Sequence, residues 1–358
     1  METFMSNYFT GDERLETFNA TGAPMRMGDI SQLNIPDFLV LKNFIANNKW
    51  EEARQYLNFF YSQNTGMISF LVESVHSMTN LYAQMTSAQN EESLRKKAIL
   101  DYQNLIKIIG ENYTELEDQS VLVQARNYFS EENLHSQTAA GFLTSLEKTY
   151  NQLSSAVDAK ESELALKKLT SYHHQALIYH DALIAFTYSY PTTVMSVSGE
   201  KVAIEVCNGS IMKNPLWNGM WELTKVLTPV DLAAFLADHL RFHFSGKNRE
   251  GQIGVVEDDK KIRLIFDPCG SGGALRRNLK DKIVNLEESH QLGWNKCGEV
   301  NLYCSHCALN EKKSIDMFGY PKLVVEFEAD PDKPCGWTIY KNPSDVPAEV
   351  YTRLGLKK

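Results

Sequence analysis

The spacing of apolar residues changes along the chain near residue 248. From about 36 to 245, apolar side chains recur every three or four positions, which is typical of amphipathic helices. "PDFLVLKNFIANNKWEEARQYLNFFYSQ" predicts two helices separated by the polar "ANNK", and "GMISFLVESVHSMTNLYAQMTS" predicts another. "EESLRKKAILDYQNLIKIIGE" predicts a helix that ends at Gly110. The first two thirds of the chain are therefore expected to be helical.

Three further features refine this expectation. Two more helices are predicted over about 131–157 and 159–188, with Pro191 ending the second. The stretch "TTVMSVSGEKVAIEVCNGS" that follows suits either a hairpin or a linker. "TPVD" predicts a helix start with Thr228 as its N-cap, running to about His243 and leaving through Gly246.

Beyond residue 250 the apolar residues come in short β-type runs. "IGVVEDDKKIRLIF" predicts a hairpin, and "KLVVEFE" and "GWTIYK" predict two more strands. The fold class is thus α+β. We expect a loose N-terminal arm over 1–30, a helical domain over 31–248, and a cysteine-rich module with a small antiparallel sheet over 249–358.

Composition narrows the classes of function. The 358 residues carry a net charge of −9, and no basic block is longer than three residues, which argues against nucleic acid as a partner. No long uninterrupted apolar run is present, so we expect no membrane partner, and the start of the chain lacks a signal-peptide pattern. We therefore expect a cytoplasmic protein with reduced thiols. The oligomeric state is left open.

Four cysteines have the spacing of a zinc site. Cys304 and Cys307 stand three apart in "YCSHC", and Cys269 and Cys335 each occur in a Pro-Cys-Gly turn. The glycine lets the backbone curl so that amide groups can face the sulfur, which offsets the cost of a buried thiolate. Four thiolates from three loops would form a closed tetrahedral Zn²⁺ site that stabilises the C-terminal sheet.

Other interpretations of these cysteines remain open. Either His306 or Cys297 could replace one of the four ligands, because spacing excludes neither residue. Cys304 and Cys307 could form a redox dithiol, although the βαβ context of that motif is missing. The cysteines could also be unconnected small core residues.

The loop "GSGGALRR" offers a possible anion contact. A glycine-rich turn after a strand can cradle a phosphate or carboxylate, and Arg276 and Arg277 would be the groups that bind it. The loop matches neither the P-loop nor the dinucleotide fingerprint. Its other interpretation is a flexible turn that serves the metal site.

Four of the nine histidines fall on apolar helix faces. His239 and His243 share a stripe with Leu232, Phe235, Leu236 and Leu240, and His173 and His180 share one with Leu169 and Leu177. Such a histidine is usually a core residue bonded to a carbonyl or carboxylate. Two pairs, with Asp181 and Asp238 beside them, also suit acid–base chemistry or a second metal, Fe or Zn.

The C-terminal motifs carry a resemblance. "DPCGSGG", "YCSHC", "GYP" and "PCGWTIYKNPSDVP" resemble, over roughly residues 240–355, a group of bacterial proteins of unassigned function. The resemblance implies no activity.

These features together predict a small-molecule enzyme. It would have a structural zinc at the cysteines and a pocket between the two regions, lined by His173, His180, His239 and His243. The pocket would bind a small molecule, and an anionic one could be oriented by Arg276 or Arg277. The alternative is a zinc-stabilised ligand-binding or regulatory protein without catalysis.

Overall fold

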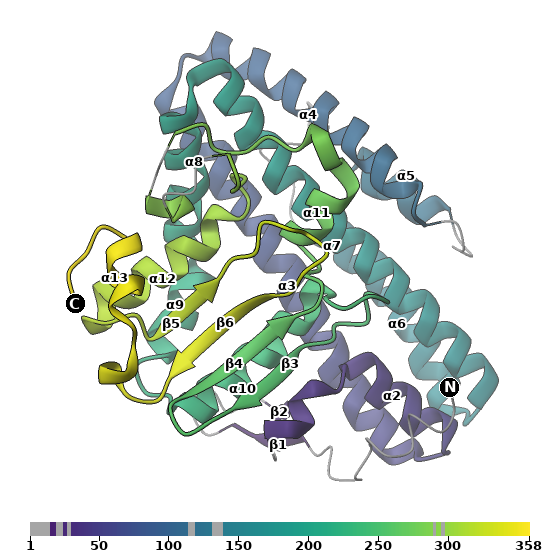
Figure 1. Ribbon diagram of the computed structural model, residues 1–358. Coiled ribbons are helices and arrows are strands. Elements are labelled where there is room, and N and C mark those ends of the chain that lie inside the picture. Colours follow the sequence, from purple (N-terminus) through teal and green to yellow (C-terminus); the bar gives the residue numbers. More distant parts are fainter. Residues whose placement is uncertain are drawn as a thin grey trace.

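The chain folds into a mainly helical α+β structure with a small antiparallel sheet in its C-terminal part (Figure 1). The computed structural model describes residues 15–18, 24–26, 30–113, 119–130, 139–288, 291–294 and 298–358. Its strands are β1 (Leu15–Thr17), β2 (Pro24–Arg26), β3 (Gly254–Glu257), β4 (Lys261–Phe266), β5 (Leu323–Glu326) and β6 (Cys335–Tyr340). Its α-helices are α2 (Asp37–Ala46), α3 (Trp50–Met85), α4 (Ala88–Gly110), α5 (Ser120–Asn127), α6 (Ala140–Asp158), α7 (Ser162–Ser198), α8 (Glu200–Lys213), α9 (Pro215–Leu223), α10 (Pro229–Leu240), α11 (Gly272–Leu279), α12 (Ser305–Phe318) and α13 (Ala348–Arg353).

Helix α7 is the centre of the helical region. It packs against α2, α3, α4, α6 and α8, and every residue from 175 to 191 is buried. A helix that is covered on all sides is apolar all round, and this segment is rich in Leu, Ile, Ala and aromatic residues. The polar residues it does carry, His180 and Asp181 among them, are consequently held inside the protein.

Two predicted helix boundaries were wrong. The helix that starts at Trp50 continues through Gly66, so two of the predicted helices are one. Helix α7 runs through Pro191 to Ser198, and the undecided stretch after it belongs to α7 and α8. Proline removes one backbone donor from a helix. Here Pro191 is buried in a helix that packs against α3, α4, α6 and α8, and this packing outweighs the local preference.

The predicted start of α10 is confirmed. The Thr228 hydroxyl accepts a hydrogen bond from the Asp231 amide at 3.2 Å and donates one to the Asp231 carboxylate at 2.6 Å. The helix ends at Leu240, and a single 3₁₀ turn carries the chain to His243. Phe244, with φ of +52°, reverses the backbone there before Gly246 does so.

The predicted hairpin and both later strands are confirmed. The sheet order is β3-β4-β6-β5, with all neighbours antiparallel. Buried and partly exposed residues alternate along β4, so that Ile262, Leu264 and Phe266 face the interior. Helix α10 packs against β4 and β6, and in Figure 1 the sheet lies in front of the helices. The sheet and the helices thus share an interface.

The expected loose arm contains paired segments. β1 and β2 form a short antiparallel ribbon, and the side chain of Arg26, the last residue of β2, is buried. Its guanidinium donates to the Asp37 carboxylate at 2.9 Å, and its amide donates to the Asp238 carboxylate at 3.0 Å. Asp238 also pairs with Arg241, so this aspartate joins the arm to α10.

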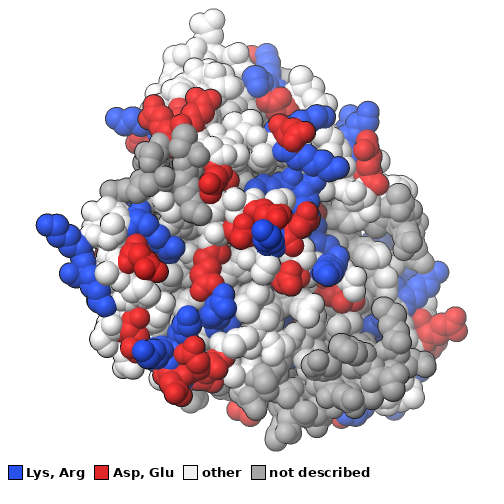
Figure 2. Space-filling view, viewed as in Figure 1, with Lys and Arg blue, Asp and Glu red and all other residues white. Residues whose placement is uncertain are grey.

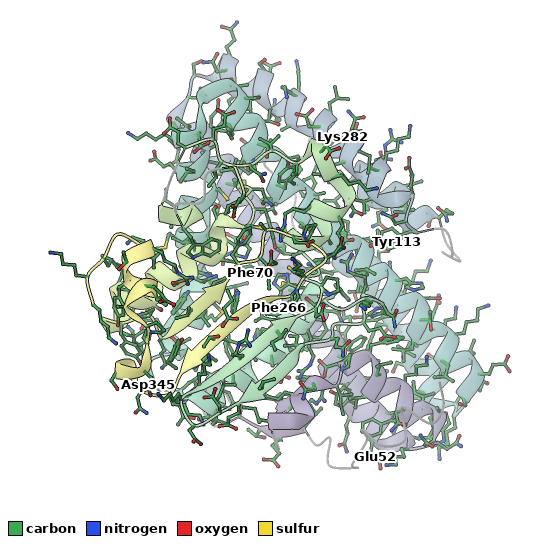
Figure 3. The ribbon with its side chains drawn as sticks, viewed as in Figure 1. Glu52, Phe70, Tyr113, Phe266, Lys282 and Asp345 are labelled. Atoms are coloured by element: carbon green, nitrogen blue, oxygen red, sulfur yellow. The ribbon has the colours of Figure 1, made fainter. Side chains whose placement is uncertain are left out.

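The interior is continuous across the predicted domain boundary. One cluster of buried apolar residues includes members from α2 to β6 and as far as Leu354. Figure 3 places Phe70 of α3 and Phe266 of β4 at the centre of the molecule, with Glu52, Lys282 and Asp345 toward its edges. The division at residue 248 stays a prediction.

The charge distribution on the surface and the apolarity of the helices complete the description of the fold. Basic and acidic side chains are interspersed on the face shown in Figure 2. Within the described part of the chain, no helix combines the length and the apolarity that crossing a bilayer would require.

Candidate functional site

A large apolar pocket lies between the helices and the C-terminal region. Its volume is about 690 Å³, and we call it the apolar pocket. Most of the residues that line it come from α3, α8, α9 and α10, and the others come from α7, the turn after α10, the segment around the start of α12, and β6. They include Gly66, Met67, Phe70, Leu71, Cys207, Ile211, Trp217, Gly219, Met220, Phe235, Leu236, His239, Leu240, His243, Tyr303, His306, Asn310 and Trp337. A cavity of this size with few polar groups has the properties of a small-molecule site.

Three imidazoles line this pocket. The ring of His239 hydrogen-bonds through Nδ1 to the Phe235 carbonyl at 2.8 Å, and that of His306 hydrogen-bonds through Nδ1 to the Tyr303 carbonyl at 2.5 Å. Each carbonyl can only accept, so both rings carry their proton on Nδ1 and keep Nε2 as an acceptor. Burial lowers the pKa of His239, His243 and His306. The pocket therefore has neutral imidazoles along one wall.

The structure places the four predicted zinc ligands around one small cavity. Cys269, Cys304, Cys307 and Cys335 line a space of about 70 Å³, which we call the thiol cavity. Cys269 follows β4, Cys335 begins β6, and Cys304 and Cys307 lie at the start of α12. The two cavities have Leu240, His243, Tyr303, His306 and Trp337 as common lining residues. These five side chains therefore lie between the four thiols and the apolar pocket.

Glycines make the close packing of the thiol cavity possible. A Cβ on Gly270 would lie 1.9 Å from the His243 carbonyl oxygen, and one on Gly272 would lie 2.5 Å from the Cys304 sulfur. On Gly273 it would lie 2.9 Å from the Cβ of Cys269. Real side chains do not approach so closely, so the "CGSGG" segment can only be wedged here with hydrogen in place of a Cβ.

The four cysteines form no disulfide, and three of their thiols have a raised pKa. Burial raises the pKa of Cys304 to about 12 and that of Cys307 well above its ordinary value, and the neighbouring sulfurs act in the same direction. Burial also raises the pKa of Cys335. Four thiols this close disfavour one another's charge, so forming thiolates here requires a cation.

A metal-ligating arrangement is absent from the described residues. Over those ranges, no group of three or more His, Cys, Asp or Glu side chains is placed so that it could hold an ion. His306 lies beside the set, with Nε2 3.5 Å from the Cys307 sulfur. Cys297, the other alternative ligand, lies outside the described residues. Zinc at the cysteines thus stays a prediction.

The two predicted anion-binding arginines hold backbone carbonyls. Arg276 donates to the carbonyls of Glu328 and Ala329 at 2.7 and 2.6 Å, and its guanidinium lies over the Phe327 ring. Arg277 donates to the carbonyls of Pro331 and Cys269. These contacts fix the loop before β6 against the segment that carries Cys269. They favour a structural role over the predicted contact with substrate.

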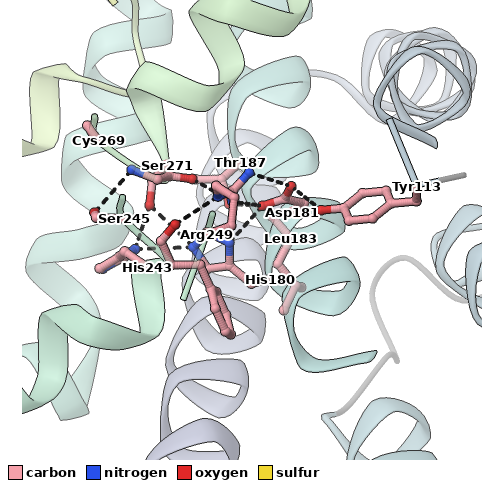
Figure 4. A network of polar contacts seen from close by, with 12 residues as sticks. Tyr113, His180, Asp181, Leu183, Thr187, His243, Ser245, Arg249, Cys269 and Ser271 are labelled. Carbon is pink, nitrogen blue, oxygen red and sulfur yellow. Dashed lines mark hydrogen bonds and ion pairs between the residues drawn. The ribbon is translucent and has the colours of Figure 1, made fainter. Parts of the chain in front are cut away.

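A chain of buried polar groups borders the thiol cavity (Figure 4). The Asp181 carboxylate accepts a hydrogen bond from His180 Nδ1 at 2.9 Å. His180 Nε2 lies 3.3 Å from the Ser271 hydroxyl and 3.2 Å from His243 Nδ1, and His243 Nδ1 lies 2.7 Å from the same hydroxyl. We call Asp181, His180, His243 and Ser271 the serine relay. It links helix α7 to the loop before α11.

Arg249 and Tyr113 hold the carboxylate of the relay. Arg249 donates to Asp181 at 2.7 Å and to the carbonyls of Phe244 and Gly270, and the Tyr113 hydroxyl donates to Asp181 at 2.7 Å. Burial acts to raise the pKa of Asp181, but Arg249 and His180 hold it below its usual range. The residue is therefore a carboxylate, and it can only accept from His180.

His173 lies apart from both cavities. Its Nε2 donates to the Arg249 carbonyl at 3.2 Å, and its ring packs against Phe38 and Phe244. Burial lowers its pKa to about 3. Of the four predicted histidines, the structure brings His180 and His243 together, and His239 lines the apolar pocket together with His243. His173 has the contacts of a core residue.

Sequence reasoning missed three members of this region. Ser271 stands between two glycines, in the short loop after a predicted strand and directly before helix α11, which is a position where a serine side chain can be exposed to a cavity. The segment was predicted either to bind an anion or to serve the metal site as a flexible turn, and neither prediction gives Ser271 a role. Arg249 and Tyr113 have no local pattern, since both reach Asp181 from distant parts of the chain.

Known proteins add no further guide to this site. Comparisons with protein-family models, with curated proteins and with solved structures each found no match. The resemblance of the C-terminal motifs to a bacterial group therefore stays an expectation.

Proposed function

We propose that this protein is an enzyme that binds a small, largely apolar molecule in the apolar pocket and acts on it with the imidazoles at the wall shared with the thiol cavity. The observation that carries the proposal is the meeting of the 690 Å³ pocket with His239, His243 and His306. An apolar pocket with a few converging polar groups of perturbed pKa is the usual form of an active site.

The chemistry follows from the state of these rings. A neutral imidazole offers one acceptor and one donor nitrogen, so it can take a proton from a substrate and return one. His243 is the best placed of the three, because its ring lines both cavities and contacts His180 and Ser271. We assign His243 and His180 to proton transfer and His239 to contact with the ligand.

The finer part of the proposal is a structural Zn²⁺ at Cys269, Cys304, Cys307 and Cys335. Its support is that the four thiols line one cavity, and that burial raises the pKa of Cys304, Cys307 and Cys335, where a divalent cation would replace protons. When bound, zinc would hold the turn after β4, the start of β6 and the start of α12 together.

The pocket is tested by closing its mouth. Gly66 on α3 and Gly219 on α9 line it, and a Cβ at either position would meet nothing within 4 Å. The double variant Gly66→Leu/Gly219→Leu should weaken saturable binding of 8-anilinonaphthalene-1-sulfonate (ANS) at least tenfold, measured by fluorescence titration. The matched control Gly66→Ala/Gly219→Ala should bind within about twofold of the unmodified protein. Equal binding by all three proteins would refute the pocket.

Catalysis is tested by turnover. The protein is incubated with a mixture of apolar metabolites, and the mixture is followed by mass spectrometry. We expect at least one compound to be consumed in large excess over the protein, and His243→Ala and the Leu double variant to consume none. Consumption that stops at one molecule per chain would instead identify a ligand-binding or regulatory protein, the second class that the apolar lining suits.

The zinc is tested by elemental analysis of protein purified without chelator. We expect one zinc per chain, lost in Cys304→Ser and Cys335→Ser and retained in Cys207→Ser. Cys207 is a fitting control because it is buried and donates to the Leu302 carbonyl, outside the thiol cavity. A second ion, Fe or Zn, that disappears in His239→Ala would assign a catalytic metal to the imidazoles. Zinc-free protein with an intact fold would refute the structural ion.

A further inference from the structure

The serine relay has the order of groups that activates a serine hydroxyl. Asp181 holds Nδ1 of His180, so the ring proton is on that nitrogen and the lone pair of Nε2 faces His243 Nδ1 and Ser271. That lone pair lies 3.3 Å from the Ser271 hydroxyl. An acid, an imidazole and a hydroxyl in this sequence form the arrangement in which the imidazole accepts the hydroxyl proton while the acid fixes the tautomer.

The local backbone presents Ser271 in a suitable way. Ser271 lies at the turn from β4 into α11, and it is 5% exposed and lines the thiol cavity. Gly270 and Gly272 on either side allow the turn to pack against the His243 backbone and Cys304. The amides of Gly272 and Gly273 are in the first turn of α11, where the helix itself provides no acceptors for them. They are the available donors for an oxygen anion formed next to Ser271.

The relay also connects with the apolar pocket. His243 contacts Ser271 on one side and lines the apolar pocket on the other, together with Tyr303 and His306. A molecule whose apolar part fills the pocket therefore has its inner end one side chain away from the Ser271 hydroxyl. Figure 4 shows the hydroxyl and both rings turned toward each other.

We propose that Ser271 is the nucleophile of an acyl-transfer site, that His180 is its general base, and that the substrate is a carboxylic ester with an apolar body. Asp181 is a positioning residue, since it acts through His180, and Arg249 and Tyr113 hold it in place. This inference rests on the proposed function of the apolar pocket and names the substrate class for it.

The reaction balances with water alone. The Ser271 oxygen forms a bond to the ester carbonyl carbon, and its proton passes to His180 Nε2. The tetrahedral intermediate then releases the alkoxide, which takes that proton and leaves as an alcohol. Water attacks the acyl-serine and gives a proton to His180, the bond between Ser271 and the acyl carbon breaks, and the serine recovers its proton. The net change is ester plus water to acid plus alcohol.

The test uses two fluorophosphonates, one with an ethyl and one with an octyl chain. In the full-length protein the Ser271 oxygen should displace fluoride from phosphorus, giving one adduct per chain that peptide mapping places on Ser271. The octyl reagent should react at least about tenfold faster, because its chain fills the apolar pocket. Ser271→Ala should give no adduct. Ser210→Ala is the matched control, since Ser210 is also buried but donates to the Cys207 carbonyl, and it should react as the unmodified protein does.

Variants of the relay separate chemistry from folding. His180→Gln and Asp181→Asn should slow labelling by about 10²–10⁴-fold, whereas their affinity for ANS should stay within about twofold. A loss of ANS binding and of the circular-dichroism signal in both variants would indicate unfolding, and Ser271→Ala then decides alone, because it removes only one hydroxyl.

The outcomes distinguish this inference from the proposed function. Saturable ANS binding without an adduct on Ser271, or with an adduct elsewhere, would overturn the nucleophile and leave the pocket standing. Labelling of Ser271 at equal rates by both reagents, without ANS binding, would support the nucleophile and remove the pocket as its substrate site.

Discussion

The two cavities differ in how the chain builds their walls. The apolar pocket is lined mainly by side chains from helix faces, with open space beside Gly66 and Gly219. The thiol cavity brings together the segment after β4, the start of α12 and the start of β6, and Gly270, Gly272 and Gly273 in the first of these are packed against the backbone of His243 or the side chains of Cys304 and Cys269. Larger side chains should therefore be tolerated at the rim of the apolar pocket but not around the thiol cavity. The following predictions test that contrast.

The largest effect is expected for Gly270→Ala. The added Cβ would lie 1.9 Å from a main-chain oxygen, which cannot move away as a flexible side chain could. We expect a loss of about 3 kcal/mol in the free energy of unfolding, measured by urea denaturation. Gly66→Ala, in the exposed wall of the pocket, should stabilise the protein by about 0.5–1 kcal/mol. Similar changes in the free energy of unfolding for Gly270→Ala and Gly66→Ala would contradict the proposed difference between the two cavities.

The enclosure of the thiol cavity should also slow the reaction of its cysteines with alkylating reagents. The pKa of Cys304 is raised to about 12 by burial, so very little thiolate is present near neutral pH. In metal-stripped native protein we expect Cys304 to react with iodoacetamide at least about 100-fold more slowly than in the unfolded chain. Mass spectrometry of alkylated peptides measures both rates. Rapid reaction of Cys304 and Cys307 together would instead support the redox dithiol.

Loss of a guanidinium beside the thiols should have an intermediate effect. Arg276→Met leaves the carbonyls of Glu328 and Ala329 without their donor, and we expect a cost of about 2 kcal/mol. The control is Arg263→Met on β4, whose partly exposed ion pair with Glu326 should contribute less than about 1 kcal/mol. Urea denaturation of both variants gives the difference, and a larger loss at Arg263 would contradict the assignment.

The smallest effect concerns a histidine outside both cavities. The pKa of His173 is lowered to about 3, so between that pH and about 6.5 the unfolded chain binds a proton that the folded chain does not. Stability therefore falls as the pH is lowered through this range. In His173→Leu the loss between pH 6 and pH 5 should be smaller by about 1 kcal/mol, read from urea midpoints. An unchanged pH dependence would place the titration elsewhere.

The sequence anticipated structure where local patterns decide it. Periodicity predicted α4 and its end at Gly110, the Thr228 cap of α10, and the β3–β4 hairpin. It failed at Pro191, where helices on several sides keep α7 continuous. Local preferences could not reveal that packing, because it depends on segments distant in the chain.

The sequence indicated which residues belong to the site, but it did not indicate which residues they contact. Spacing singled out the four cysteines and the inward histidines, and the structure places the cysteines around one cavity. Spacing could not tell that His180 would contact Ser271 and His173 would contact a carbonyl, because those partners lie 91 and 76 residues away. It also could not tell that Arg276 and Arg277 would be occupied by carbonyls.

Arg249 makes the two halves of the chain dependent on each other. Its guanidinium holds Asp181 of α7, while its other donors hold Phe244 and Gly270. A polypeptide that stopped at residue 248 would contain a carboxylate in an apolar interior with its countercharge missing. The two pieces, produced separately, should consequently acquire their native form only by associating.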